Sequence, residues 1–117
     1  MATYRLEILN WHPASANMLD RNRWVRYSCK KRDAKMVRGY ALAGQVPPAT
    51  CKRRVSVTLE YSTRRWHMDP ENAQKSLLDA LVNVGLLVDD NQKWKEMGVW
   101  ESVRTGRAAT VIVLEDC

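Results

Sequence analysis

The apolar residues of this 117-residue chain change their spacing along the sequence, and this change of period constrains the fold most strongly. Residues 2–9 and 54–61 carry apolar side chains at every second position, which is the period of a half-buried strand. Residues 70–84 carry them at steps of three and four, which is the period of an amphipathic helix. A chain that alternates between these periods is expected to pack helices on a β-sheet.

The rest of the chain extends this alternation. Residues 23–44 have the composition of an amphipathic helix, although Gly39 interrupts the pattern. Residues 93–103 and 108–115 have the composition of two further strands. The order strand, helix, strand, helix, strand, strand predicts an α+β (mixed α/β) fold with a single mixed sheet. The length fits one domain over residues 1–117, with a loop over residues 10–22.

Several protein classes are excluded by composition. No stretch approaches the roughly 20 consecutive apolar residues that cross a bilayer, and the N-terminus has no basic region followed by a long apolar run. We therefore expect a cytoplasmic protein with no membrane partner. Its three cysteines include no Cys-x-x-Cys pair, which argues against a disulfide framework or a zinc site. No motif for a small-molecule cofactor is found.

The net charge of +6 is concentrated in one third of the chain. Residues 21–54 contain eleven Lys or Arg and one acid, Asp33, so this segment carries +10 and the remainder carries −4. Such asymmetry suits a polyanionic partner, because neutralised phosphates release condensed counterions. A solvated basic surface is the alternative interpretation.

Acidic residues lie at both ends of the helix predicted over residues 70–84. Asp69 and Glu71 flank Pro70 at its start, and Asp89 and Asp90 follow its end. A helix of this length spans roughly 22 Å, so the two groups meet only if the chain folds back along the helix. Seven extended residues at about 3.3 Å each can cover that distance.

If the carboxylates converge, their chemistry suits a divalent metal. Magnesium prefers carboxylate oxygens and retains waters, and it can activate a water and neutralise a phosphate. Lys75, one turn beyond Glu71, could then stabilise charge that develops on the phosphate. Each residue also has a simpler interpretation: Asp69 as a helix N-cap, Glu71 with Lys75 as a surface ion pair, and residues 89–91 as a turn.

At these residues the sequence resembles the RusA family of Holliday junction resolvases. That family carries an Asp-x-Asp-Asn-x-x-Lys motif at a helix start, then Asp-Ala-Leu, a glycine and an Asp-Asp pair. The corresponding segments, in the same order and spacing, are residues 69–75, residues 79–81, Gly85 and residues 89–90. Arg64 and Arg65 also match, and residues 9–22 resemble the family's loop after its first strand.

The resemblance implies a structure-specific endonuclease, of the kind found in bacteriophages and prophages, that resolves four-way DNA junctions in recombination and repair. By position, Asp69, Glu71 and Asp90 would hold Mg²⁺, with Mn²⁺ as a substitute, and Lys75 would be the fourth catalytic residue. Asn72 and Asp89 would support them. The family also implies a homodimer, whose two equal sites suit a two-fold junction. One residue departs from the motif, because Glu71 stands where the family has aspartate, and this leaves open whether activity is weakened.

Cations along the chain are the candidates for contact with DNA phosphates. They are Arg21, Arg23, Lys30, Lys31, Lys52, Arg53, Arg54, Arg64 and Arg65. Trp24 and Trp66 border these charges, and either stacks on an unpaired base or, as is more common, packs in the core. Two rival functions remain open: a DNA-binding module that no longer cuts, and a nuclease that prefers flaps or forks.

Overall fold

The structure is a computed structural model, and it describes residues 2–15, 18, 22–62 and 68–117. It confirms an α+β domain with one mixed four-stranded sheet and two helices. In chain order the elements are β1 (Thr3–Leu9), α2 (Arg23–Ala43), β2 (Arg53–Tyr61), α3 (Pro70–Asn83), β3 (Lys95–Arg104) and β4 (Ala109–Asp116).

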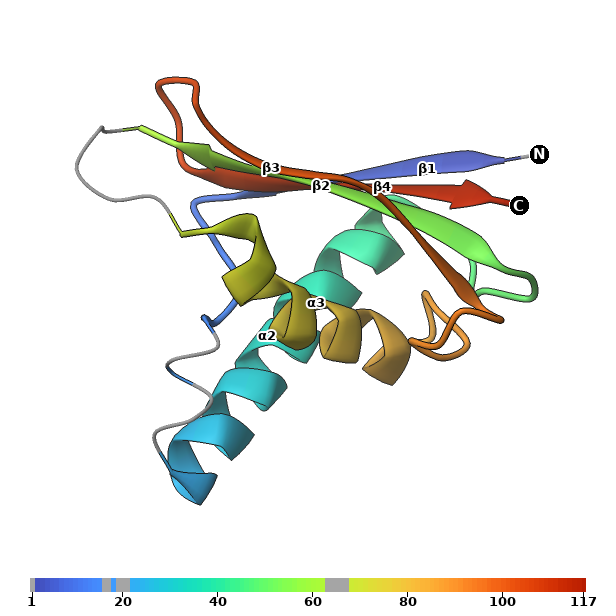
Figure 1. The fold of residues 1–117 in the computed structure, drawn as a ribbon, viewed down its shortest axis with the longest axis horizontal. Helices are drawn as coiled ribbons and strands as arrows, with labels where there is room; N and C mark the ends of the chain where they lie inside the picture. The colour runs from blue at the N-terminus through green and yellow to red at the C-terminus, as the bar shows by residue number, and fades with distance from the viewer. Residues whose placement is uncertain (1, 16–17, 19–21, 63–67) are drawn as a thin grey trace.

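The sheet has the strand order β1-β4-β2-β3. β4 pairs antiparallel with both β1 and β2, whereas β2 and β3 are parallel. Parallel neighbours require a crossover connection, and α3 supplies it. Both helices lie on the same face of the sheet (Figure 1). α2 crosses α3, and its first turns extend beyond α3, away from the sheet (Figure 1).

The core lies between this face and the two helices. The strands contribute alternate side chains such as Ile8, Val57 and Ile112, each almost fully buried. From α3 come Leu77 and Leu81, one helical turn apart. The predicted spacing of apolar residues, every second residue in the strands and every third or fourth in α3, therefore matches the residues that the sheet and α3 bury.

The ends of both helices follow local signals. The Asn22 side chain accepts a hydrogen bond from Val25 N at 2.9 Å and so caps the start of α2. Gly39 does not end this helix, which continues to Ala43. After α3, Gly85 adopts φ +85°, a conformation that favours glycine and closes the helix as the sequence predicts. Neither α2 nor α3 has the length and apolar content to cross a membrane.

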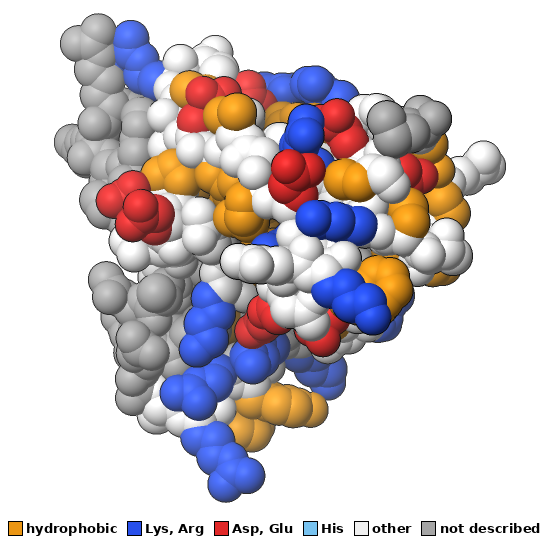
Figure 2. All heavy atoms as spheres, turned by 45° about the vertical axis from the view of Figure 1, so that its right-hand side comes forward, with side chains coloured by type: hydrophobic (Ala, Val, Ile, Leu, Met, Phe, Trp, Pro, Cys, Tyr) orange, Lys and Arg blue, Asp and Glu red, His pale blue; other side chains and the backbone are white. Residues whose placement is uncertain are grey.

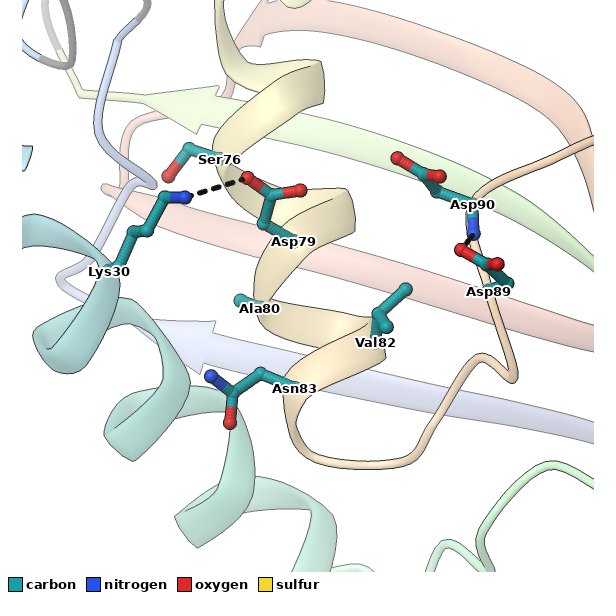
Figure 3. A pocket seen from close by; sticks show the side chains of 8 residues that line it. All are labelled: Lys30, Ser76, Asp79, Ala80, Val82, Asn83, Asp89 and Asp90. Carbon is teal, nitrogen blue, oxygen red and sulfur yellow. Dashed lines mark hydrogen bonds and ion pairs between the residues drawn. The ribbon is translucent and has the colours of Figure 1, made fainter.

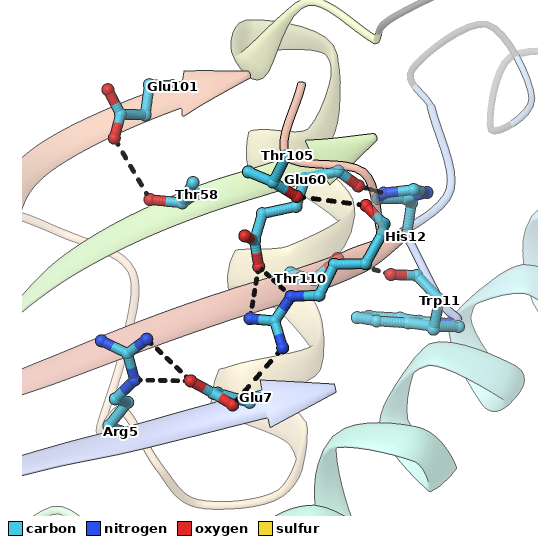
Figure 4. A network of polar contacts seen from close by, with 10 residues as sticks. Arg5, Glu7, Trp11, His12, Thr58, Glu60, Glu101, Thr105 and Thr110 are labelled. Carbon is cyan, nitrogen blue, oxygen red and sulfur yellow. Dashed lines mark hydrogen bonds and ion pairs between the residues drawn. The ribbon is translucent and has the colours of Figure 1, made fainter. Parts of the chain in front are cut away.

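The opposite face of the sheet, which we call the outer face, carries charged side chains (Figure 4). Arg107 Nη2 lies 2.7 Å from Glu60 Oε2, and Arg107 Nη1 lies 3.8 Å from Glu7 Oε2. Arg5 pairs with Glu7 at 2.7 Å, and this hydrogen bond is the main reason that the pKa of Glu7 lies below its ordinary value. These charged side chains of the outer face thus form ion pairs with one another.

Candidate functional site

Asp69 begins α3 and presents a carboxylate that the helix does not use. Its backbone is in the N-cap position with φ −61° and ψ 131°, and Pro70 follows in the first turn. The Asp69 side chain nevertheless makes no capping hydrogen bond, although the Asp69 carbonyl accepts one from Asn72 N at 2.9 Å. The simple N-cap interpretation therefore does not account for this carboxylate.

The backbone before Asp69 is fixed by two strands. Met68 N donates to the Tyr61 hydroxyl at 3.0 Å, and Ser102 Oγ donates to the Met68 carbonyl at 2.5 Å. Tyr61 in turn stacks on His12, with ring centroids 4.2 Å apart, and burial raises the pKa of its hydroxyl. β2 and β3 thereby set the position at which Asp69 enters the helix.

Glu71 and Lys75 are both exposed on α3. Among the described residues they form no ion pair, with each other or with another side chain, so the surface-pair interpretation is not realised. Asp69 and Glu71 together line a pocket of about 480 Å³ against β3, beside Met97 and Trp100. Asn72, the predicted supporting residue, is also exposed.

The two aspartates in the turn after α3, Asp89 and Asp90, differ in the hydrogen bonds that their side chains make. Both carboxylate oxygens of Asp89 accept local hydrogen bonds, from Asp90 N at 2.7 Å and from Asn91 Nδ2 at 3.2 Å. Asp89 therefore shapes the turn. The Asp90 side chain has no hydrogen bond or ion pair in the part of the chain that the structure describes, and it projects toward α3 (Figure 3).

A second pocket, of about 330 Å³, separates this turn from the helices. Asp79 and Ser76 of α3, Lys30 of α2 and both turn aspartates line it (Figure 3). Lys30 Nζ lies 3.6 Å from Asp79 Oδ2 and so links the two helices. The chain after α3 thus does fold back, and it brings Asp90 to the pocket that Asp79 lines.

Asp90 lines this pocket, whereas Asp69 and Glu71 line the pocket against β3. Asp79 lies eight residues beyond Glu71, which is about 12 Å along an α-helix. The described residues include no group of three or more His, Cys, Asp or Glu side chains placed to hold one metal ion. The carboxylates suit magnesium in donor type. The convergence of Asp69, Glu71 and Asp90 on one ion is not seen in this arrangement.

Asp33 is a polar residue of this region that the sequence did not single out. It is fully buried, and its Oδ2 accepts hydrogen bonds from Ala14 N at 3.1 Å and from the Ser76 hydroxyl. Burial raises the pKa of its carboxyl above the ordinary value. The hydrogen bond between Asp33 and Ser76 links α2 to α3 at Ser76, the residue after Lys75. The only sequence signal of Asp33 is that it is the single acid in a cationic segment.

The predicted DNA-binding cations fall into three groups. Arg23, Lys30 and Lys31 are exposed on α2, whereas Arg21, Arg64 and Arg65 lie outside the described residues. At β2, Lys52 is half-buried and Arg54 pairs with Glu96 at 3.2 Å.

Arg53 requires a correction. It is only 2% exposed, its Nε lies 2.8 Å from Asp116 Oδ1, and its Nη1 donates to the Leu86 carbonyl at 3.0 Å. Its guanidinium also lies over the Tyr4 ring. A side chain so enclosed cannot reach a phosphate, and the assignment of Arg53 to DNA binding was wrong because sequence charge does not reveal which strand face a residue occupies.

Trp24 also differs from the more common expectation. It is 74% exposed and belongs to neither cluster of buried apolar residues. Trp66 lies outside the described residues.

Comparison with known proteins does not assign this chain to a family. No model of a known protein family matches the sequence, and no similar curated protein is found.

Proposed function

We propose that this protein is a RusA-like endonuclease that hydrolyses phosphodiesters at four-way DNA junctions. One observation carries the proposal. The four side chains assigned to catalysis by motif position are exposed, and within the described residues none is occupied by a hydrogen bond or ion pair. They are Asp69, Glu71, Lys75 and Asp90. A purely structural role would occupy a side chain with local hydrogen bonds, as it does for the carboxylate of Asp89.

The roles follow from the chemistry of the side chains. Asp69, Glu71 and Asp90 would hold Mg²⁺, or Mn²⁺ in its place, and a bound ion of this kind activates water and neutralises phosphate charge. Lys75 would stabilise negative charge on the scissile phosphate. Asp89 supports Asp90 by shaping the turn, and Asn72 supports Asp69 through its backbone hydrogen bond.

The exposed cations of α2 favour a DNA partner. Each contact with a phosphate releases counterions, and a set of such contacts recognises the shape of the backbone. The proposal includes a homodimer, since two equal sites can make the paired cuts that resolve a junction. It also includes action in the cytoplasm of a bacterial or phage-infected cell, during recombination and repair.

Glu71 favours a second candidate function. Its carboxylate is one methylene further from the backbone than that of the motif aspartate, and magnesium is strict about octahedral geometry. A protein that binds junctions without cutting them is therefore the alternative. A preference for flaps or forks would change the substrate but leave the chemistry the same.

A labelled synthetic four-way junction distinguishes these candidates. We expect cleavage with Mg²⁺ and none with EDTA. Asp90→Asn should reduce the single-turnover rate by orders of magnitude while junction affinity persists, because the cationic surface is unchanged. Glu101→Gln is the matched control, since it removes a carboxylate from an exposed position on β3. Tight binding by the parent protein without any cleavage would support the non-cutting module.

Lys75→Ala tests the remaining catalytic assignment. With every junction bound, we expect a loss on the order of a hundredfold or more, the scale seen when a transition-state donor is removed. Partial rescue by Lys75→Arg would indicate a mainly electrostatic role. A Lys75→Ala rate within about threefold of the parent would exclude Lys75 from the chemical step.

A further inference from the structure

Two large aromatic side chains are exposed at the beginning of α2. Trp24 is 74% exposed and Tyr27 is 60% exposed. They lie three residues apart and so share one side of the helix, with ring centroids 6.3 Å apart and planes inclined by 30°. Neither ring is packed in the core of the described structure. An exposed aromatic pair of this kind offers flat apolar surface to a partner.

The geometry of the domain explains why this aromatic pair is exposed. The buried residues of α2 begin at Cys29, so residues 23–28 include none. These residues form the part of α2 that extends past the sheet and α3 (Figure 1). Burial among the described residues therefore does not explain the choice of aromatic side chains at positions 24 and 27.

The surroundings of the aromatic pair are cationic. A hollow of about 610 Å³ is lined by Arg23 and the two rings. Tyr27 also borders a hollow of about 620 Å³ that Lys31 and Arg38 help to line. The single acid of α2, Asp33, is buried, so this helix presents no exposed carboxylate. Figure 2 shows Lys and Arg side chains beside a hydrophobic group at the lower end of the molecule, where α2 begins.

Flat aromatic rings among cations match the chemistry of unpaired nucleotides. Every base has a π-face that can stack on an aromatic side chain, and the phosphates nearby attract Lys and Arg. Paired bases within a duplex present their edges instead, because their faces are already stacked. A second copy of this chain is a poorer match, since a two-fold contact through the start of α2 would place its cations against the same cations.

We propose that Trp24 and Tyr27 stack on unpaired DNA bases while the Lys and Arg residues of α2 hold the adjoining phosphates. This inference rests on the proposed function for the identity of the ligand as DNA. It adds that the protein distinguishes branched or single-stranded DNA from continuous duplex through unstacked bases. The aromatic pair binds and does not take part in hydrolysis.

The test measures binding to a single-stranded oligothymidine that carries one 2-aminopurine. Trp24→Leu keeps an apolar side chain but removes the flat ring, and Trp24→Phe keeps a ring. We expect Trp24→Leu to weaken binding about 5- to 150-fold, the range for the loss of one base–aromatic stack. The salt dependence of binding should be unchanged, because stacking releases no counterions. Trp24→Phe should retain most of the affinity and the quenching of 2-aminopurine.

Leu42→Ala is the matched control, because Leu42 is 73% exposed on the same helix and lies near its other end. Tyr27→Leu provides a second variant should Trp24→Leu fold poorly by circular dichroism. Equal affinity of Leu42→Ala, Trp24→Leu and Tyr27→Leu would overturn the proposal, as would a parent protein that binds no oligonucleotide. A change from dimer to monomer in Trp24→Leu, by sedimentation, would identify a subunit interface instead and also overturn it.

Junction cleavage, measured in parallel, separates this inference from the proposed function. If the parent protein binds the oligonucleotide through Trp24 but does not cut junctions with Mg²⁺, the stacking site stands and the nuclease fails. If it cuts junctions and Trp24→Leu loses no affinity, the nuclease stands and the stacking site fails.

Discussion

The two cationic segments of the chain, α2 and the start of β2, use similar side chains in opposite ways. On α2, Lys31 and Lys35 face solvent on the exposed side of the helix. At β2, Arg53 is enclosed by Asp116, the Leu86 carbonyl and the Tyr4 ring. The first set is available to a partner, whereas Arg53 belongs to the protein interior.

The reason for the difference is the period of each element. A helix whose buried positions fall on one stripe leaves the other positions to solvent, and α2 buries Cys29, Ala34, Val37 and Ala41 in this way. A strand sends neighbouring residues to opposite faces, so Arg53 points toward the helices and Arg54 toward the outer face. Charges that are counted together in a sequence can therefore have unrelated roles.

The comparison predicts its largest effect at Arg53. Arg53→Ala should lower the free energy of unfolding by about 3 kcal/mol or more, because it leaves Asp116 and a buried carbonyl without their donor and opens a cavity. Urea denaturation measures the loss. Lys31→Ala, an exposed substitution, should change stability by no more than about 0.5 kcal/mol. Similar losses for the two variants would break the distinction between interior and surface cations.

The second prediction concerns DNA binding by α2. Lys31→Ala should lower the slope of log K against log salt concentration by about 0.9, the value of one phosphate contact. Fluorescence anisotropy with a four-way junction at several salt concentrations measures the slope. Arg5→Ala is the control, because it removes the same charge from the outer face, where Arg5 pairs with Glu7. If the two variants change the slope equally, the protein responds to net charge and α2 has no special role.

Local signals explain which parts of the fold could be predicted from sequence. The alternation around Val57 predicted β2, and the Asp69-Pro70 start with Gly85 after the end predicted α3 to within a residue. These signals act through neighbouring residues, so no knowledge of the tertiary structure is needed. The mixed sheet followed from the order of such elements, since parallel neighbours need a helical connection.

The unpredicted features all depend on contacts between distant segments. Asp79 and Asp90 share a pocket because of the path taken by the chain after Gly85, which sequence spacing permits but does not determine. The burial of Asp33 depends on where α3 places Ser76. The exposure of Trp24 depends on how far α2 extends past the sheet.

Asp33 gives the third prediction, because it is the single acidic residue of α2 and is buried. Burial raises the pKa of its carboxyl, so the folded protein binds this proton more readily than the unfolded chain does. The resulting stabilisation is present below the ordinary carboxyl pKa of about 3.9 and is lost as the pH rises through the raised value. Asp33→Asn should therefore gain stability relative to the parent as the pH rises from about 4 to 7.

Urea unfolding of both proteins at several pH values measures this difference. Glu101→Gln, at an exposed position, should not follow the same trend. Parallel pH profiles for Asp33→Asn and the parent would show that the carboxyl titrates alike in the folded and unfolded states.

The smallest effects are expected at Arg54, the sequence neighbour of Arg53. Arg54 pairs with Glu96 on the outer face, and this hydrogen bond is the main reason that the pKa of Glu96 is lowered. A lowered carboxyl pKa contributes stability above the ordinary value, and the contribution is lost as the pH falls through the lowered one. Arg54→Ala should thus lower the free energy of unfolding by only a small part of the loss expected for Arg53→Ala, because exposed pairs are screened by water. The loss should be present at neutral pH and absent in acid.

Since α2 lies on the other face of the sheet, Arg54→Ala should also leave the salt dependence of junction binding unchanged. Anisotropy titrations beside Lys31→Ala measure this directly, and a drop in slope equal to that of Lys31→Ala would mean that DNA also contacts the outer face.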